Sequence, residues 1–454
     1  MTNNESLFIR DMLGAVSKAH AHYGMATTMT TRSTSKYYFP LSAIIFLFYF
    51  AWASTLSMAS QWLWQILQLD STTKGLFFTA NAIGAMLFQP IYGAIQDRLG
   101  VSKKLLLWIG LVLALCWPVM GYVFVFLMKD VSSIVALIVS GLFIALGILA
   151  AAGVVDSYCE RVGRNAGLEY GTVRVWGAVG WCLGVLIAGR FALEGVLVNL
   201  PYIACTVAGV LLLLVLFRLD DRGAQVAAVP GQAQQVASMS ESLSVLGEFK
   251  FWSFAIFLFG IAGLYFLFDQ QFQDYYATFF NVPGAEAGAG GKAYSYLYAS
   301  ETVIEVICLP LVPIVVNLLG ARKSLVLAAF IMGMRVLLTG LVADKVFLTI
   351  FFLVRGFEIP LLLVAVFKFM EGVYDPRFSS TIYLIAFQFA QQFCSICFAG
   401  LVGYLIDHYS FQHAYVALGV FGLVFMLWGL IMLPRPKKGS INTPPLESAT
   451  PAAQ

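Results

Sequence analysis

Apolar runs of about 20 residues recur along nearly the whole chain, and this repetition limits the fold more than any other feature. A helix of about 20 residues crosses the hydrocarbon core of a bilayer. Only 11% of the residues are charged, against roughly 25% in soluble domains, so the chain lacks the polar surface of a water-exposed globule. The runs therefore predict an all-α membrane protein.

The apolar runs form two sets of six with a polar stretch between them. They lie at about 39–64, 75–96, 105–128, 132–157, 172–192, 196–217, 251–280, 293–318, 324–342, 346–370, 379–405 and 413–434. We predict a tail (1–37), a six-helix bundle (38–217), a linker (218–250), a second six-helix bundle (251–434) and a tail (435–454). Two similar halves predict twelve transmembrane helices in two pseudo-symmetric bundles.

Lysine and arginine residues are unevenly divided between the two ends of the predicted helices. Of the 27, 19 lie on the side of the tails, 5 lie on the opposite side, and the remaining 3 fall inside or at the edge of spans. Cytoplasmic loops carry the excess of basic residues, so we expect a multi-pass inner-membrane protein with both termini in the cytoplasm. Residues 1–37 have no apolar core near their start, which argues against a cleaved signal peptide.

Several charged residues fall within or at the edge of the predicted spans. A charge at membrane depth costs about 2.5–3.5 kcal/mol, so it normally faces a watery cavity or a partner. The candidates are Asp156, Arg174, Asp269, Asp274, Glu301, Glu305, Arg335, Arg355 and Glu358. Some, Asp274 above all, lie near a span end, from which a side chain can reach the interface instead. So many internal charges indicate a polar path through the membrane.

Arg355 and Glu358 are three residues apart, so they share one face of their helix. Desolvation favours the neutral form of a buried carboxyl group, whereas a neighbouring arginine favours the ionised form. Movement or hydration of the arginine would therefore switch Glu358 between holding and releasing a proton. This is our hypothesis for proton coupling.

Other chemistries lack the residues that they need. The four histidines lie in the N-terminal tail or beside the last external loop, away from mid-membrane. The one Cys-x-x-Cys pair has no second Cys/His pair, so we expect no metal or redox centre and no cofactor. Neither a nucleophile–base pair nor a phosphate-binding Gly-x-x-x-x-Gly-Lys motif occurs, which argues against an enzyme and against built-in ATP drive. The small net charge of +3 reflects loop residues, not a nucleic-acid surface.

The loop after the second span carries a recognisable motif. Residues Gly93 to Lys104 read G-A-I-Q-D-R-L-G-V-S-K-K, which resembles the G-x-x-x-D-R-x-G-x-x-K/R signature of the major facilitator superfamily. The glycines allow a tight turn, and Asp97 can pair with basic residues or a helix N-terminus. A degraded copy at 317–323 supports two related halves.

Longer stretches resemble the oligosaccharide:proton symporter branch of that superfamily. They are Asp156–Val162, Glu169–Trp181, Phe268–Phe272, Met334–Arg335, Phe357–Pro360 and Phe378–Leu384, and the resemblance runs from about 40 to 434. It implies a secondary active transporter that imports an oligosaccharide with protons by alternating access, as two bundles rock around a midplane site.

The resemblance also implies a sugar-binding group of residues. It assigns Asp156, Arg174 and Trp181 to the sugar, together with Gln392. A carboxylate accepts hydrogen bonds from sugar hydroxyls, a guanidinium donates a fork, and an indole covers the CH face of the ring. The family has Glu where this chain has the shorter Asp156, which suggests a shifted specificity.

A second group is implied for proton translocation. Glu358 matches the proton-carrying acid, with Arg335 as its nearby arginine. The remaining members are Arg355, Tyr265, Asp269 and Glu305. On the eighth span the family has one acid, and Glu301 and Glu305 both stand near that position. We assign Glu301 to the sugar and Glu305 to the proton path, and the choice of functional acid stays open.

Three departures from the family pattern affect charge. Arg355 replaces a histidine, and Phe352 replaces a lysine whose aspartate partner, Asp269, is kept. We therefore expect Arg355 to neutralise Asp269. A second Asp/Lys pair is lost at both ends, as Phe266 and Gln391, which avoids an unpaired buried charge costing several kcal/mol.

The expected substrate is a disaccharide such as lactose, melibiose or sucrose, or a trisaccharide such as raffinose. We expect a monomer whose partners are the sugar, protons and the lipid bilayer, with no nucleic acid. The alternative is a proton-independent facilitator or an exporter of another small polar solute.

The variant Glu358→Gln tests the proton hypothesis, because glutamine keeps the shape of the side chain but cannot exchange a proton. We expect uphill sugar accumulation to fall to the diffusive level while sugar exchange across the membrane survives. Labelled-sugar uptake and exchange in vesicles measure both. Proton-coupled accumulation in the variant would show that Glu358 is not the carrier.

Overall fold

The computed structural model describes residues 36–100, 102–168, 170–191, 198–219, 245–280, 288–375 and 382–435. Within these ranges every regular element is a helix, and the all-α prediction is confirmed. The predicted N-terminal tail, most of the predicted linker and nearly all of the C-terminal tail lie outside the described residues.

The N-terminal half begins with the helix Lys36–Leu56. The following elements are α2 (Ala59–Leu67), α3 (Ser71–Leu99), α4 (Lys104–Ala114), η1 (Pro118–Phe124), η2 (Leu127–Val131), α5 (Ser133–Ile144), η3 (Ala145–Leu149), α6 (Ala151–Asn165), α7 (Tyr170–Phe191) and α8 (Leu200–Arg218). A turn at 57–58 divides the first predicted run into two helices.

The C-terminal half begins with a short helical turn before its first long helix. Its elements are η5 (Val245–Gly247), α11 (Phe249–Thr278), α12 (Ala289–Cys308), α13 (Val312–Leu319), α14 (Ala321–Leu341), α15 (Lys345–Val373), η7 (Tyr383–Phe389), α17 (Ala390–His408) and α18 (Phe411–Met432).

The helices account for the predicted number of spans. Among the described residues, nine helices are long and apolar enough to cross a bilayer, and two bent pairs add two more. The twelfth span is α3. It is less apolar than the others because polar residues occur along it, but its 29 residues reach about 44 Å, which is long enough to cross the bilayer. The bends of 48° between α4 and η1 and of 58° between α12 and α13 lie beside Pro118 and Pro310. Proline breaks the helical hydrogen-bond ladder, which explains both bends.

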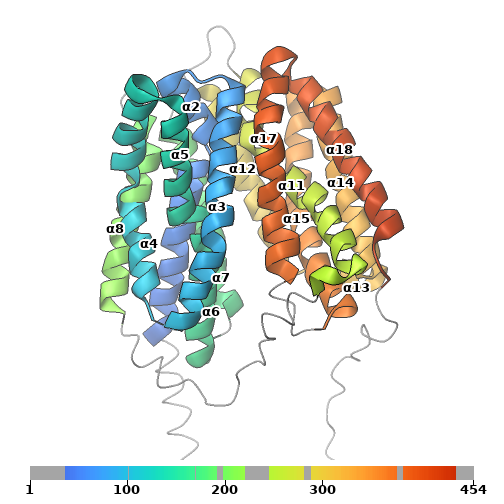
Figure 1. Ribbon diagram of the computed structural model, residues 1–454, viewed down its shortest axis with the longest axis horizontal. Helices are drawn as coiled ribbons and strands as arrows, with labels where there is room; N and C mark the ends of the chain where they lie inside the picture. The colour runs from blue at the N-terminus through green and yellow to red at the C-terminus, as the bar shows by residue number, and fades with distance from the viewer. Residues whose placement is uncertain are drawn as a thin grey trace, which may run out of the picture.

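The two halves form two bundles that meet at one end and separate toward the other (Figure 1). The contact runs between α3 and α17 and between α7 and α12. A Cβ atom on Gly75 of α3 would lie 2.3 Å from the carbonyl oxygen of Ala399, and one on Gly403 of α17 would lie 2.1 Å from that of Ser71. Backbones therefore touch at the end of the molecule where α3 begins and α17 finishes, which we call the closed end.

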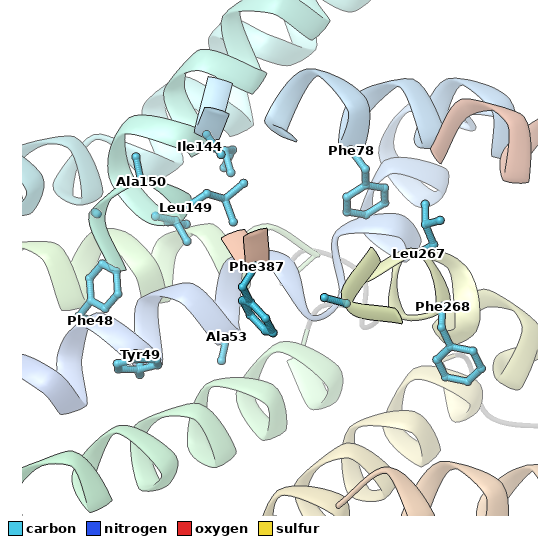
Figure 2. Packing of buried hydrophobic residues seen from close by; sticks show 14 of the residues in the cluster. Phe48, Tyr49, Ala53, Phe78, Ile144, Leu149, Ala150, Leu267, Phe268 and Phe387 are labelled. Carbon is cyan, nitrogen blue, oxygen red and sulfur yellow. The ribbon is translucent and has the colours of Figure 1, made fainter. Parts of the chain in front are cut away.

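Apolar side chains fill the bundles and also cover their outer surface. Figure 2 shows part of the buried cluster, with Phe48 and Tyr49 of the first helix on one side and Leu267 and Phe268 of α11 on the other. Many other large apolar residues lie exposed on the surface, and Phe217, Leu318 and Ile431 are among the most exposed of them. Such a surface suits hydrocarbon as the surrounding medium.

The packing of the first helix against α7 makes a stability prediction. A Cβ on Gly180 would lie 2.3 Å from the carbonyl oxygen of Phe46, whereas one on Gly171 of the same helix meets nothing within 4 Å. Gly180→Val should lower the free energy of unfolding by about 1–3 kcal/mol, because the helices must move apart. Thermal unfolding in detergent measures this, with Gly171→Val as the matched control. Equal stability of the two variants would contradict the observed packing.

Candidate functional site

Asp156 of α6 and Arg174 of α7 lie together in the N-terminal bundle. Nε of Arg174 is 3.8 Å from Oδ1 of Asp156, and the hydroxyl of Tyr49 donates to Oδ2 at 2.8 Å. The guanidinium also covers the ring of Tyr49, 4.0 Å from its centroid. The two charged side chains keep 33% and 38% of their surface exposed, so a solute can reach them. Oδ1 of Asp156 is itself buried and accepts no hydrogen bond from the described residues.

A series of aromatic rings leads from this pair to the other bundle. Tyr49 stacks on Trp52 at 5.7 Å, and Trp52 meets Trp181 edge-on at 5.5 Å. Trp181 in turn meets Tyr298 of α12 at 6.1 Å. Trp181 therefore lies between Trp52 of its own bundle and Tyr298 of the C-terminal bundle, and the series of rings connects it to Tyr49 of the charged pair.

Arg335 of α14 and Glu358 of α15 form a buried, two-pronged ion pair. Nε and Nη2 of the arginine donate to the two carboxylate oxygens at 2.9 and 2.6 Å. The side chains are 2% and 0% exposed. Phe268 closes one face of the guanidinium at 4.4 Å from its ring centroid. Planar bidentate pairing of this kind is the strong form of a charged hydrogen bond.

Arg355 of α15 is the centre of a second buried cluster. Its Nη2 donates to Asp269 at 2.6 Å, to Tyr298 at 3.4 Å and to the hydroxyl of Tyr265. Its Nη1 lies 3.6 Å from a carboxylate oxygen of Glu301. One arginine thus faces two carboxyl groups and two tyrosines, and the expected neutralisation of Asp269 by Arg355 is present.

The partner of Glu358 differs from the hypothesis drawn from the sequence. That hypothesis paired Glu358 with Arg355, because the two share a helix face. Among the described residues, the arginine that hydrogen-bonds Glu358 is Arg335, while Arg355 turns toward α11 and α12. The three-residue spacing defines a face of α15 but not which neighbouring helix supplies the partner, so the hypothesis is corrected on this point. The family resemblance named Arg335 as the arginine near Glu358, and the hydrogen bonds agree with it.

Helix α12 carries three of the relevant side chains at spacings of three and four residues. Tyr298, Glu301 and Glu305 therefore lie along one side of it. Glu301 is buried beside Arg355, whereas Glu305 is half-buried and interacts electrostatically with Arg174 of the other bundle. Both acids therefore interact with Arg355, and Glu305 interacts with Arg174 as well.

The positions of the other predicted residues say less about function. Gln392 is buried on α17, as is its neighbour Gln391. Phe352, at the position of the family lysine, stacks on Phe272 at 5.0 Å. In the part of the chain that the structure describes, no group of three His, Cys, Asp or Glu residues is placed to hold a metal ion.

Three aromatic residues of the site were missed by the sequence reasoning. Tyr49 and Trp52 are three residues apart on the first helix, and Tyr298 precedes Glu301 by three. A tyrosine or tryptophan one turn from another site residue was the available signal. In a chain with 15% aromatic residues that signal does not stand out from ordinary packing.

The buried pair Arg335–Glu358 predicts unequal effects of removing its two partners. Glu358→Met leaves a guanidinium that cannot lose its proton, whereas Arg335→Met leaves a carboxyl group that can become neutral. We expect Glu358→Met to lower the free energy of unfolding by about 3–5 kcal/mol, and Arg335→Met by clearly less. Thermal unfolding in detergent measures both, with the double variant as control. A larger loss for Arg335→Met would contradict this reading.

Comparison with known proteins agrees with the geometry. The family described as LacY proton/sugar symporter matches residues 28–445. The chain is 31% identical to a sucrose permease of Escherichia coli over 415 residues, covering 91% of this chain and 97% of that protein. It is 32% identical to a raffinose permease of Escherichia coli over 399 residues, covering 87% and 92%.

The fold has solved counterparts as well. The crystal structure of the nucleoside transporter NupG superposes with a TM-score of 0.73 at 14% identity, covering 88% of this chain and 99% of that one. At that identity the likeness concerns the fold, and it confirms the architecture of two six-helix bundles. Together with the family match over nearly the whole chain, it shows that this protein belongs to the LacY proton/sugar symporter family.

Proposed function

We propose that the chain imports an oligosaccharide together with a proton by alternating access. The observation that carries the proposal is the charge count of the buried cluster. Two guanidinium groups, on Arg335 and Arg355, face three carboxyl groups, on Glu358, Asp269 and Glu301. An unpaired buried carboxylate costs several kcal/mol, so one of the three holds a proton. A transporter that binds a proton inside the membrane needs such a group.

The hydrogen-bond partners of the three acids indicate which of them carries the proton in the described conformer. Glu358 has both oxygens bound to Arg335, and Asp269 lies 2.6 Å from Arg355. Glu301 is the weakest partnered acid, at 3.6 Å from Arg355 and 2% exposed. The proton therefore rests on Glu301 in this conformer, and Glu358 takes it once Arg335 moves away. Arg355 holds Asp269 in place, Tyr265 accepts a hydrogen bond from the same nitrogen of Arg355, and Glu305 links the path to Arg174.

The sugar site lies on the N-terminal bundle. Asp156 accepts hydrogen bonds from two sugar hydroxyls, and Arg174 donates to a third. Trp181 covers the CH face of a sugar ring. Gln392 contributes from the facing bundle, and Glu301 borders both the sugar and the proton cluster. Tyr49 holds the Asp156 carboxylate through its hydrogen bond.

The position of the closed end indicates to which side of the membrane the site is open. The excess of Lys and Arg on the side of the termini supports a cytoplasmic location for them. The closed end is the opposite one, so this conformer faces inward. We propose an inner-membrane monomer, since a single chain supplies both bundles and both parts of the site. A proton entering down the membrane potential supplies about 2.3 kcal/mol per 100 mV, enough for roughly 50-fold accumulation of sugar.

The substrate is proposed to be a di- or trisaccharide. The relatives include permeases for sucrose, raffinose, melibiose and lactose. Lactose and melibiose belong to the same size class, and the side chains at Asp156 and Arg174 do not by themselves select among hydroxyl stereochemistries.

Uptake of labelled lactose, melibiose, raffinose, sucrose and maltose by cells, with recording of external pH, tests the proposal. We expect at least one sugar to enter and to raise the external pH, because protons accompany it. Tyr49→Phe should raise the KM for that sugar by about tenfold, in line with roughly 1.4 kcal/mol for a hydrogen bond to a charged group. Asp156→Asn is the control that should lose uptake. Uptake without a pH rise would indicate a facilitator, and no uptake of any sugar would overturn the proposal.

A further inference from the structure

A second ion pair lies outside the site, at the closed end, and joins the two bundles. Nζ of Lys74 on α3 is 2.5 Å from Oδ2 of Asp274 on α11. The hydroxyl of Ser60 on α2 donates to the same oxygen at 2.5 Å. The lysine and aspartate side chains are only 5% and 14% exposed. Asp274 is therefore not reaching out to the interface from its span end. It is held by two residues of the opposite half.

Asp407 makes a similar contact from α17. Its carboxylate accepts from the backbone N–H groups of Ser71 and Thr72 at 2.9 and 2.7 Å and from the Thr72 hydroxyl at 2.7 Å. These residues form the first turn of α3, where the helix dipole is positive and attracts an anion. An acid of the C-terminal half thus caps a helix of the N-terminal half.

Two side-chain amides complete the contact. Gln271 of α11 donates to the carbonyl oxygen of Ser71 at 3.0 Å, and Gln61 of α2 donates to that of Gln273 at 3.2 Å. Each crosses from one bundle to the other. None of these residues belongs to the sugar or proton groups described above, so the proposed transport chemistry does not require their polarity.

We propose that Lys74, Asp274 and Asp407 form an electrostatic latch, that is, a set of charged contacts between the two bundles that holds the closed end shut. The latch sets the balance between the inward-facing conformer and the conformer in which this end is open. The proposal rests on alternating access, since that end must open in each cycle. The buried pair of Lys74 and Asp274 suits a latch because its attraction is strong when dry and weak when hydrated. Asp407 is exposed, and it contributes through its hydrogen bonds to the first turn of α3. A cavity of about 550 Å³ lined by all three residues lies directly beside the ion pair. Water entering there on opening would solvate the separated charges.

Thiol labelling of the purified full-length protein tests the latch without sugar or a proton gradient. The reporter is Ser295→Cys, because Ser295 is 1% exposed and lies against Gly189 of the other bundle. Opening of the closed end exposes this position to a maleimide. We expect Lys74→Met to raise the labelling rate of the reporter about tenfold, and Asp407→Asn to raise it in the same direction. Protein without the reporter cysteine corrects for the native thiols.

Two further variants separate a latch from general damage. The charge swap Lys74→Asp/Asp274→Lys should return labelling to within about twofold of the parent, since it restores the attraction. Lys345→Met removes an exposed lysine from the same end of the C-terminal bundle and should leave labelling unchanged.

Unchanged labelling in both Lys74→Met and Asp407→Asn would overturn the proposal, and so would a swap that labels as fast as Lys74→Met. If Lys74→Met does not reach the membrane, Asp274→Asn gives the same comparison. A chain that proves not to carry sugar but shows these labelling changes would retain the latch and lose only the transport proposal.

Discussion

In the C-terminal bundle, the buried carboxyl groups outnumber the buried guanidinium groups that can neutralise them, and the proposed proton coupling depends on this imbalance. Arg335 is committed to Glu358 through two hydrogen bonds, and Arg355 is shared between Asp269 and Glu301. A buried guanidinium cannot become neutral, whereas a buried carboxyl group can, by taking up a proton. The excess acid is therefore where a proton can bind, and any movement of either arginine changes which acid holds it. Charge balance in a dry interior is the constraint from which proton coupling follows.

Helix α12 connects this constraint to the sugar site. Its Tyr298 contacts both Trp181 and Arg355, and its Glu305 interacts with Arg174 across the two bundles. A solute that binds near Asp156 and Trp181 therefore touches side chains that contact Tyr298 and Glu305. These two residues of α12 in turn interact with the buried charge cluster around Arg355. The structure thus offers a short physical route from sugar binding to the protonation of a buried acid, through packed rings and ion pairs.

Much of this could be predicted from the sequence, and the rest could not for identifiable reasons. Apolar runs of membrane length predicted the twelve spans, and isolated charges within them marked Asp156, Arg335 and Glu358, because each such charge is costly in lipid. Spacing along α15 pointed to Arg355 as the partner of Glu358 and was wrong, since spacing along one helix does not reveal which neighbouring helix approaches. The family resemblance pointed to Arg335, which is the residue that hydrogen-bonds Glu358. Tyr298 was hidden among many aromatic residues of the core. The pairing of Asp274 joins segments 200 residues apart and became visible only with the bundles in place.

Charge movement during sugar entry tests the central claim most directly. Proteoliposomes holding the full chain, adsorbed on a supported membrane without any ion gradient, receive a sudden addition of a sugar that the protein transports. Because the sugar is neutral, current arises only if a proton travels with it. The account predicts a transient current that carries positive charge in the direction of sugar entry and that disappears in Glu358→Gln. Sugar entry at a normal rate without any current would contradict it.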